Sequence, residues 1–195
     1  MSKMEIKLLA LDVLLNFNVR DKLMTHCHVF FVSGVSGTGK STLSQHLAER
    51  FDMPFEEGDR YHSEANVEKM SSGIPLQDAD RWEWLITLNM IAKQHIHADR
   101  NVVISCSALR SAYRDVLTKD IAPHCHFIYL HASQSVLSAR LKQREHFFNG
   151  DAMLESQFAA LELPSKDNAF IIDVTQTFEC VSQQAEDFIR PLISN

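Results

Sequence analysis

The sequence predicts an α/β fold, in which one domain holds a parallel β-sheet covered by helices on both faces. The chain has 195 residues, and roughly 100–200 residues is usual for a single domain. Hydrophobic residues make up 45% of it and charged residues 23%, close to the average of globular domains. Its short apolar runs do not alternate with polar residues, and segments of helical periodicity separate them. Unalternating strands divided by helices are typical of parallel sheets buried on both faces.

Five apolar runs are expected to form the strands. They lie at Val29–Ser33, Pro54–Glu57, Val102–Ser105, Phe127–Leu130 and Phe170–Val174. Periodicity and helix-start signals predict helices between and after them. These helices span Ser41–Phe51, Ser63–Ser72, 80–98, Ser111–Lys119, Ser133–Arg144, Ala152–Leu161 and Thr177–Ile193. The residues from Asp80 to Glu83 have the spacing of a capping box, so we expect the third helix to begin there.

Residues 1–27 are expected to form an N-terminal extension that precedes a single domain over residues 28–195. Apolar residues between Ile6 and Phe17 follow a spacing of three and four, which favours a helix packed on the domain or on a partner chain. A non-native start is the alternative, because Met24 stands just before the first predicted strand.

Composition excludes several classes of protein. Nineteen Lys and Arg against twenty-five Asp and Glu give a net charge of −6, which argues against a dedicated nucleic-acid binder because such proteins need a concentrated basic face. No apolar run approaches the roughly 20 residues that span a bilayer, so no membrane partner is expected. Four cysteines occur without a C-x-x-C pair, which fits reduced thiols in a cytoplasmic protein.

A phosphate-binding loop is the most specific local motif. The segment from Gly34 to Ser41 fits G-x-x-x-x-G-K-[ST], between an apolar strand and a helix. Backbone N–H groups of such a loop surround phosphate oxygens, and the helix N-terminus adds partial positive charge. Lys40 is expected to reach the β- and γ-phosphates of ATP, and the Ser41 hydroxyl to bind Mg²⁺. The candidate cofactor-binding residues are Gly34, Val35, Ser36, Gly37, Thr38, Gly39, Lys40, Ser41 and Thr42.

Other classes of phosphate-loop protein are disfavoured. GTPases need an N-K-x-D motif and a D-x-x-G motif, and neither occurs in the chain. AAA-type and helicase ATPases usually carry Asp-Glu after a strand, and this dipeptide is absent. A small-molecule kinase is therefore favoured by elimination.

Asp59 is the candidate catalytic carboxylate. It follows the second predicted strand, and ligands of open parallel sheets gather beyond the carboxyl ends of the strands. It could orient an acceptor hydroxyl and take its proton, or hold a magnesium-bound water. The alternative is a turn aspartate after Gly58.

Several residues further along the chain are candidates for binding the acceptor. His62, Asn66 and Lys69 are spaced by four and three residues, which places them on one side of a helical turn. Arg81 lies in the first turn of a predicted helix, where a cation opposes the helix dipole and so suggests an anionic partner. Arg114 is a further candidate, because it follows the strand that leads into Cys106-Ser107 by less than three helical turns. The alternatives are a solvated helix face for the first three residues and an exposed salt bridge for Arg114.

A mobile lid is expected at about residues 140–151. Arg140 and Arg144 are stacked near the end of a predicted helix, and the stretch that follows reads as a loop. Two arginines on a lid could neutralise charge on the transferred phosphoryl group and exclude water, since their planar groups bind phosphate bidentately. A plain amphipathic helix is the alternative.

The order of the motifs resembles that of gluconokinases. Besides the phosphate loop, the resemblance rests on Gly58-Asp59-x-x-His62-x-x-x-Asn66-x-x-Lys69-Met70-x-x-Gly73-x-Pro75-Leu76-x-Asp78-x-Asp80-Arg81-x-x-Trp84-Leu85, on Cys106-Ser107-Ala108-Leu109-Arg110-x-x-Tyr113-Arg114-Asp115, on Arg140-x-x-x-Arg144-x-His146-Phe147, and on Gln157-Phe158-x-x-Leu161-Glu162-x-Pro164. It covers about residues 29–190. Shikimate and nucleoside monophosphate kinases share the loop and the lid but lack the long middle block.

The resemblance implies a P-loop kinase-type three-layer sandwich with a five-stranded parallel sheet and a mobile lid, assembled as a homodimer. It implies transfer of the γ-phosphoryl group of ATP to the 6-hydroxyl of D-gluconate, giving 6-phospho-D-gluconate and ADP. Kinase activity on a related sugar acid or polyol, and a non-catalytic ATP-binding regulator, are the alternatives. The implied catalytic residues are Lys40, Asp59, Arg140 and Arg144, and the implied substrate-binding residues are Asp59, His62, Asn66, Lys69, Arg81, Arg114 and His146.

Some positions depart from the family pattern. Ser63 stands where the family usually has Pro, which leaves the fine substrate preference open. Glu145 stands where Gly is common, a change that could stiffen the lid hinge. The triplets 26–28 and 124–126 both read His-Cys-His and lead into strands that are neighbours in the family's strand order. They could together hold zinc or copper, or be unrelated polar strand starts.

Overall fold

The structure is a computed structural model that describes residues 27–143 and 150–194. Within this part of the chain five strands form one sheet, and every pairing is parallel, in the order β2-β3-β1-β4-β5. The strands are β1 Val29–Ser33, β2 Phe55–Glu57, β3 Val102–Ser105, β4 Cys125–His131 and β5 Phe170–Asp173. The predicted five-stranded parallel sheet is confirmed. Residues 1–26 of the predicted N-terminal extension and residues 144–149 of the predicted lid lie outside the described residues.

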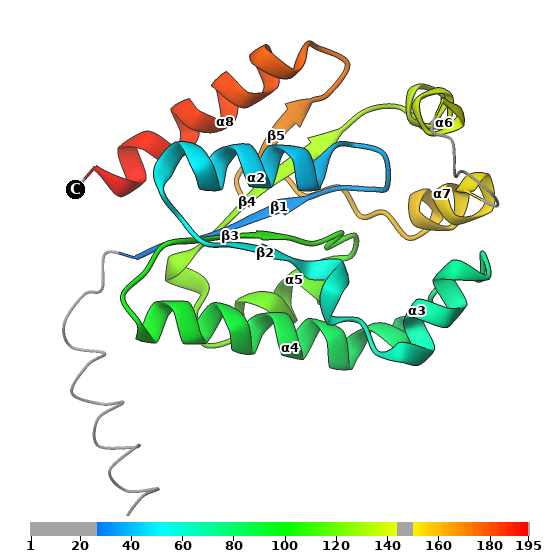
Figure 1. The fold of residues 1–195 in the computed structure, drawn as a ribbon, viewed down its shortest axis with the longest axis horizontal. Coiled ribbons are helices and arrows are strands. Elements are labelled where there is room, and N and C mark those ends of the chain that lie inside the picture. The colour runs from blue at the N-terminus through cyan, green and yellow to red at the C-terminus, as the bar shows by residue number, and fades with distance from the viewer. Residues whose placement is uncertain (1–26, 144–149, 195) are drawn as a thin grey trace, which may run out of the picture.

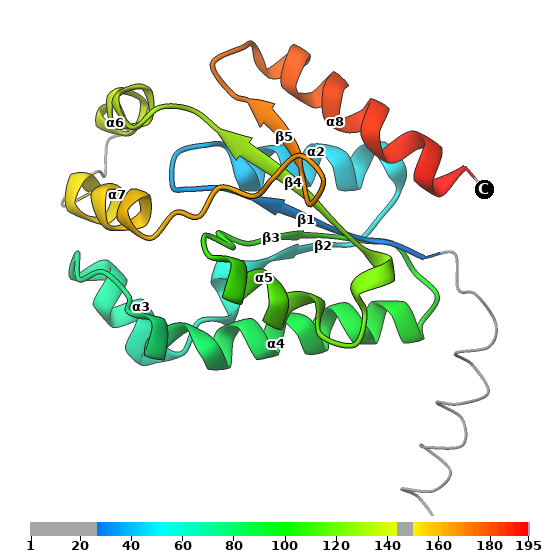
Figure 2. The same ribbon diagram turned by 180° about the vertical axis from the view of Figure 1, so that it is seen from behind.

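Helices cover both faces of the sheet. They are α2 Lys40–Phe51, α3 Glu64–Ser71, α4 Asp78–His97, α5 Ser111–Thr118, α6 Gln134–Lys142, α7 Gly150–Ala159 and α8 Phe178–Ile193, with short 3₁₀ turns η1 Gly58–Tyr61 and η2 Ala122–His124. In Figure 1, α2 and α8 lie on one side of the sheet and α4 and α5 on the other. The same three layers are seen from behind in Figure 2. The three-layer α/β class is therefore confirmed.

The central strands form the core because both of their faces are covered. All five residues of β1 and all four of β3 are buried, as their unbroken apolar sequence predicts. Phe31 of β1 stacks on Phe127 of the neighbouring β4, with ring centroids 5.2 Å apart. The outer strand β2 is only partly buried.

The predicted start of α4 is wrong by two residues. The helix begins at Asp78, and the backbone N–H of Gln77 donates a hydrogen bond of 2.9 Å to the Asp80 carboxylate. Asp80 is therefore the third residue of the helix, the N3 position of a capping box whose N-cap residue is Gln77. It is not itself the N-cap. The spacing to Glu83 that suggested the later start has no capping role.

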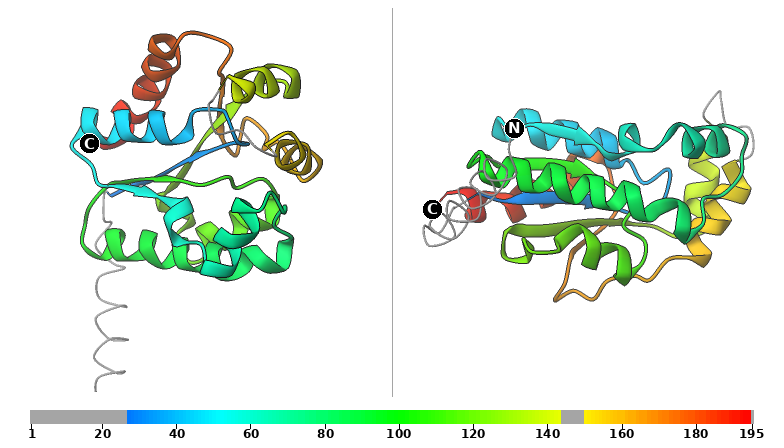
Figure 3. Two further views of the ribbon diagram at one scale, coloured as in Figure 1. Left: turned by 45° about the vertical axis from the view of Figure 1, so that its right-hand side comes forward. Right: turned by 90° about the horizontal axis from the view of Figure 1, so that it is seen from below.

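The carboxyl ends of all five strands point toward one end of the molecule. The helices α3, α6 and α7 lie beyond this end (Figure 1), and both views of Figure 3 show them there as well. Open parallel sheets bind ligands at this edge. The fold thus brings the phosphate loop after β1, the turn after β2 and the segment after β3 to one place.

At the opposite edge, the described residues of the two His-Cys-His triplets lie close together, because β1 pairs with β4 as predicted. The Nδ1 atom of His28 lies 3.0 Å from Nε2 of His126, and burial followed by the two neighbouring histidines lowers the pKa of His126 to about 4. His26 lies outside the described residues. The residues that the structure describes contain no group of three side chains suited to a metal ion, so the zinc or copper hypothesis gains no support there. Among the same residues no helix is long and apolar enough to cross a membrane.

Candidate active site

The phosphate loop joins β1 to α2 in the strand–loop–helix context that the sequence predicts. The loop turns through positive φ at three glycines, and a Cβ atom on Gly34 would stand 2.5 Å from the backbone oxygen of Leu130. Glycine is therefore required at the start of the loop. Two side chains close the loop on itself: Thr38 Oγ1 donates to the Val35 carbonyl at 2.8 Å, and Lys40 Nζ donates to the same oxygen at 3.1 Å.

Asp59 is placed by a set of hydrogen bonds to the residue before it. The Gly58 N–H donates to Ser105 Oγ at 3.2 Å, and Trp84 Nε1 donates to the Gly58 carbonyl at 2.7 Å. Ser105 Oγ in turn donates to the Glu57 carboxylate. A Cβ atom on Gly58 would lie 2.1 Å from the Ser105 carbonyl oxygen, so only glycine fits. The Asp59 side chain emerges from this anchored turn into solvent.

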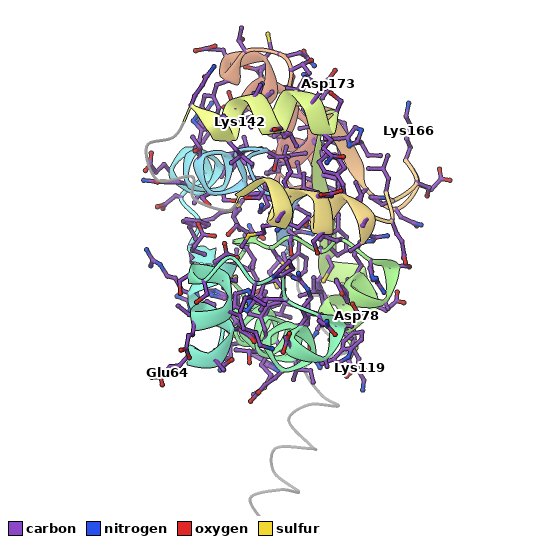
Figure 4. The ribbon with its side chains drawn as sticks, turned by 90° about the vertical axis from the view of Figure 1, so that its right-hand side faces the viewer. Glu64, Asp78, Lys119, Lys142, Lys166 and Asp173 are labelled. Atoms are coloured by element: carbon purple, nitrogen blue, oxygen red, sulfur yellow. The ribbon has the colours of Figure 1, made fainter. Side chains whose placement is uncertain are left out.

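A pocket lies between the phosphate loop, the turn after β2 and α7. Figure 4 looks onto this end of the molecule, where α7 crosses between α6 and the pair α3 and α4. The pocket is lined by Ser36, Lys40, Asp59, His62, Met70, Pro75, Leu76, Arg81, Ser107, Met153, Ser156 and Gln157. The predicted residues Lys40, Asp59, His62 and Arg81 are thus brought together.

Arg81 places a buried positive charge in this pocket. The side chain is only 9% exposed. Its one described hydrogen bond is a long one, from Nη2 to the Leu76 carbonyl at 3.4 Å, and its guanidinium carbon lies 5.9 Å from the ring centroid of Tyr113. No carboxylate among the described residues forms an ion pair with it. A buried cation without an anionic partner is unfavourable, so the site is suited to an anionic ligand.

His62 offers a neutral imidazole beside that charge. Its ring stacks on Trp84 with centroids 4.2 Å apart. Burial lowers the pKa of His62, Asp59 opposes this shift, and Arg81 adds to it. Because the ordinary value is already below 7, the ring is predominantly neutral at pH 7. It can then donate one hydrogen bond and accept another, a combination that suits hydroxyl groups.

The buried thiol of Cys106 is a further sign that the charged groups converge. It lies directly after β3, and burial raises its pKa to about 12. Asp59 raises the same pKa, whereas Lys40 and Arg81 lower it. The thiol therefore stays protonated, as an uncharged buried group near the three charged ones.

Three predicted acceptor-binding residues do not line the pocket. Asn66 Nδ2 donates to the Asp80 carbonyl at 2.6 Å, and Lys69 Nζ forms an ion pair of 2.6 Å with the Asp80 carboxylate. Both contacts join α3 to α4, and the pair with Lys69 is the main cause of the lowered pKa of Asp80. Arg114 Nη1 donates to the Ala108 carbonyl at 2.9 Å and so holds the segment after β3. Their binding of an acceptor stays a prediction.

Of the two predicted lid arginines, the structure describes Arg140 alone. Arg140 Nη2 donates to the Val174 carbonyl, directly after β5, and the residue does not line the pocket. Arg144 and His146 lie outside the described residues. The catalytic and binding roles of all three stay predictions.

Sequence reasoning assigned no role to several pocket residues. Ser107 follows β3, so the rule that singled out Asp59 could have found it as well. Gln157 of α7 begins one of the motifs on which the family resemblance rests, but that motif gives it no role. Its Oε1 accepts a hydrogen bond of 2.6 Å from the Ser36 N–H in the phosphate loop. Only the folded structure brings together these two residues, which are 121 positions apart.

Comparison with known proteins agrees with this geometry. The family model described as "Shikimate kinase" matches residues 36–191. A gluconokinase of Gluconobacter oxydans (strain 621H) is 44% identical over 140 residues, which cover 72% of this chain and 78% of that protein. This chain belongs to the gluconokinase family. It also falls within the wider group that the shikimate kinase model describes.

Two solved structures support the assignment to the gluconokinase family. The crystal structure of a gluconokinase from Sinorhizobium meliloti 1021 has a TM-score of 0.77 and 37% identity, over 86% of this chain and 94% of that one. The unliganded crystal structure of a sugar kinase from Janibacter sp. HTCC2649 has a TM-score of 0.79 and 34% identity, over 87% of this chain and 99% of that one. The kinase class that the sequence predicts by elimination is confirmed, and so is the family resemblance.

Proposed function

We propose that this protein transfers the γ-phosphoryl group of ATP to the 6-hydroxyl of D-gluconate, giving 6-phospho-D-gluconate and ADP. The observation that carries the proposal is the buried guanidinium of Arg81, which lines the same pocket as Lys40 and Asp59. Gluconate has one carboxylate and five hydroxyls. The carboxylate would supply the anion that Arg81 lacks, and the neutral His62 ring suits the hydroxyls.

The loop after β1 would bind the phosphates of ATP. Its residues from Gly34 to Thr42 would do so through backbone N–H groups and the N-terminus of α2. Lys40 would exchange the Val35 carbonyl for a phosphate oxygen. The exposed hydroxyl of Ser41, at the second position of α2, fits an oxygen ligand of Mg²⁺. The ion would neutralise part of the phosphate charge.

The acceptor would be bound and activated by Asp59, Arg81 and His62. Arg81 would bind the carboxylate at one end of the sugar acid and thereby direct the opposite end, with its 6-hydroxyl, toward Asp59. Asp59 would then orient this hydroxyl and accept its proton as the bond to phosphorus forms. The hydrogen bonds of Gly58 fix the backbone from which the Asp59 carboxylate extends.

A coupled assay with ATP and Mg²⁺ tests the proposal against a panel of acceptors: D-gluconate, other sugar acids, shikimate and polyols. We expect D-gluconate to give the highest kcat/KM. Asp59→Asn keeps the shape but removes the base, so kcat should fall by about 10²- to 10⁴-fold while nucleotide binding is retained. A better acceptor than gluconate would favour the related-kinase alternative, and ATP binding without transfer to any acceptor would favour a regulator.

The homodimer and the cytoplasmic location are part of the proposal as well. Light scattering on the purified protein would measure the mass against the 22.2 kDa of one chain. A mass of one chain at micromolar concentration would contradict the homodimer.

A further inference from the structure

The contact between Gln157 and Ser36 joins two regions that would hold different substrates. Ser36 belongs to the phosphate loop, and Gln157 lies on α7, after the predicted lid. The Gln157 Oε1 atom accepts from the Ser36 backbone N–H at 2.6 Å, a short distance for a bond of this type. Gln157 is half-buried, and the buried Leu154 anchors α7 one turn earlier.

The Ser36 N–H is one of the groups that a phosphate loop presents to anions. Within the loop, Ser36 and Lys40 are the residues that line the described pocket, together with Asp59 and Arg81. This N–H therefore faces the acceptor side of the loop, where the terminal phosphate must lie for transfer. A phosphate oxygen that binds this N–H would have to displace the Oε1 atom of Gln157.

The carboxamide of Gln157 has further bonding capacity. Its Nε2 atom carries two donors, and no described residue accepts a hydrogen bond from it. The side chain also lines the pocket that Arg81 and His62 share. A carboxamide released from Ser36 could therefore donate to and accept from neighbouring hydroxyls without leaving the pocket.

We propose that Gln157 is a positioning residue that couples the binding of the two substrates. The terminal phosphate of ATP takes over the Ser36 N–H, and the released carboxamide binds a hydroxyl of the acceptor. The proposal rests on the proposed function for the identity of that acceptor. It requires that a nucleoside triphosphate, and not the diphosphate, tightens acceptor binding.

A first experiment tests the nucleotide side without any acceptor. Calorimetry measures the Kd of ADP and of a non-hydrolysable ATP analogue, with Mg²⁺, for the wild type and for Gln157→Glu. A carboxylate binds the Ser36 N–H more tightly than an amide does and repels the terminal phosphate. We expect the ratio of analogue Kd to ADP Kd to rise about 10-fold in the variant. An unchanged ratio would overturn the proposal whatever the acceptor is.

A second experiment measures the coupling itself. The Kd of D-gluconate is determined with ADP and with the ATP analogue, for the wild type, Gln157→Ala and the control Glu155→Ala, an exposed position on the same helix. The wild type and the control should bind gluconate about 5-fold more tightly with the analogue, whereas Gln157→Ala should show a ratio near one. Thermal melting confirms that the variants fold.

The two proposals fail in different ways. Coupling in Gln157→Ala equal to that of the wild type would overturn the role of Gln157 and leave the gluconate assignment intact. Absence of gluconate binding to the wild type would instead refute the assigned acceptor. The ratio of analogue Kd to ADP Kd in Gln157→Glu would then still decide whether Gln157 competes with the terminal phosphate.

Discussion

Because the charge of Arg81 is buried, its removal should weaken gluconate binding without lowering the stability of the fold. Replacing Arg81 by Met keeps most of the volume and removes the charge. A hydrogen bond to a charged group contributes about 1.5–3 kcal/mol, which corresponds to a rise of roughly 10- to 150-fold in KM for gluconate. The effect on kcat should be smaller, because the carboxylate is remote from the hydroxyl that reacts.

Stability should not fall with activity in this variant. The side chain is 9% exposed, its described polar contact is 3.4 Å long, and no described carboxylate pairs with it. Replacing an uncompensated buried charge by an apolar group is often neutral or stabilising, so Tm should stay the same or rise. Loss of Arg81 also removes one of the causes that lower the pKa of His62, so that pKa should move up toward its ordinary value.

Steady-state kinetics with varied gluconate and ATP, together with thermal melting, measure both effects. The KM for ATP should change less than about 3-fold, since the phosphate loop is untouched. Arg100→Met is the matched control, because Arg100 is exposed and lies beyond the end of α4 that is remote from the pocket. A wild-type KM for gluconate in Arg81→Met would refute the assignment of the carboxylate to Arg81.

Two further predictions concern the scaffold of the site. Gly58→Ala should lower the free energy of unfolding by about 1–3 kcal/mol and reduce kcat, because the new Cβ would meet the Ser105 carbonyl at 2.1 Å and displace Asp59; a denaturant titration that matches the wild type would contradict the close approach. The pKa of His126 is lowered to about 4 in the folded chain, so between pH 6.5 and 4 the unfolded chain binds more protons and stability falls as the pH falls. His126→Phe should flatten this part of the Tm–pH curve, and a variant curve parallel to that of the wild type would show that His126 does not cause the slope.

The strands and the phosphate loop could be predicted because their signals are local. An unbroken apolar run such as Val29–Ser33 is required wherever a strand is covered on both faces, and the glycines of the loop are required by positive φ and by the Leu130 carbonyl. Asp59 followed from the rule that ligands lie beyond the carboxyl ends of strands. Arg81 could be predicted because a cation in the first turn of a helix opposes the helix dipole.

The remaining features depend on contacts between distant segments. Asn66 and Lys69 share a helix face with the correct spacing, yet both bind to Asp80, and no pattern along α3 reveals that partner. The same Asp80 closes the capping box with Gln77. The start of α4 was therefore predicted too late, because the spacing from Asp80 to Glu83 imitates a capping box. The contact of Gln157 with Ser36 depends on how α7 packs over the loop, which no local sequence signal encodes.

The most direct test of the central claim is a crystal structure of the protein with a non-hydrolysable ATP analogue, Mg²⁺ and D-gluconate. We expect the gluconate carboxylate on the Arg81 guanidinium and the 6-hydroxyl within hydrogen-bond distance of an Asp59 oxygen, facing the terminal phosphate. Gluconate bound in the reverse direction, or with its 6-hydroxyl beyond the reach of Asp59, would contradict the account.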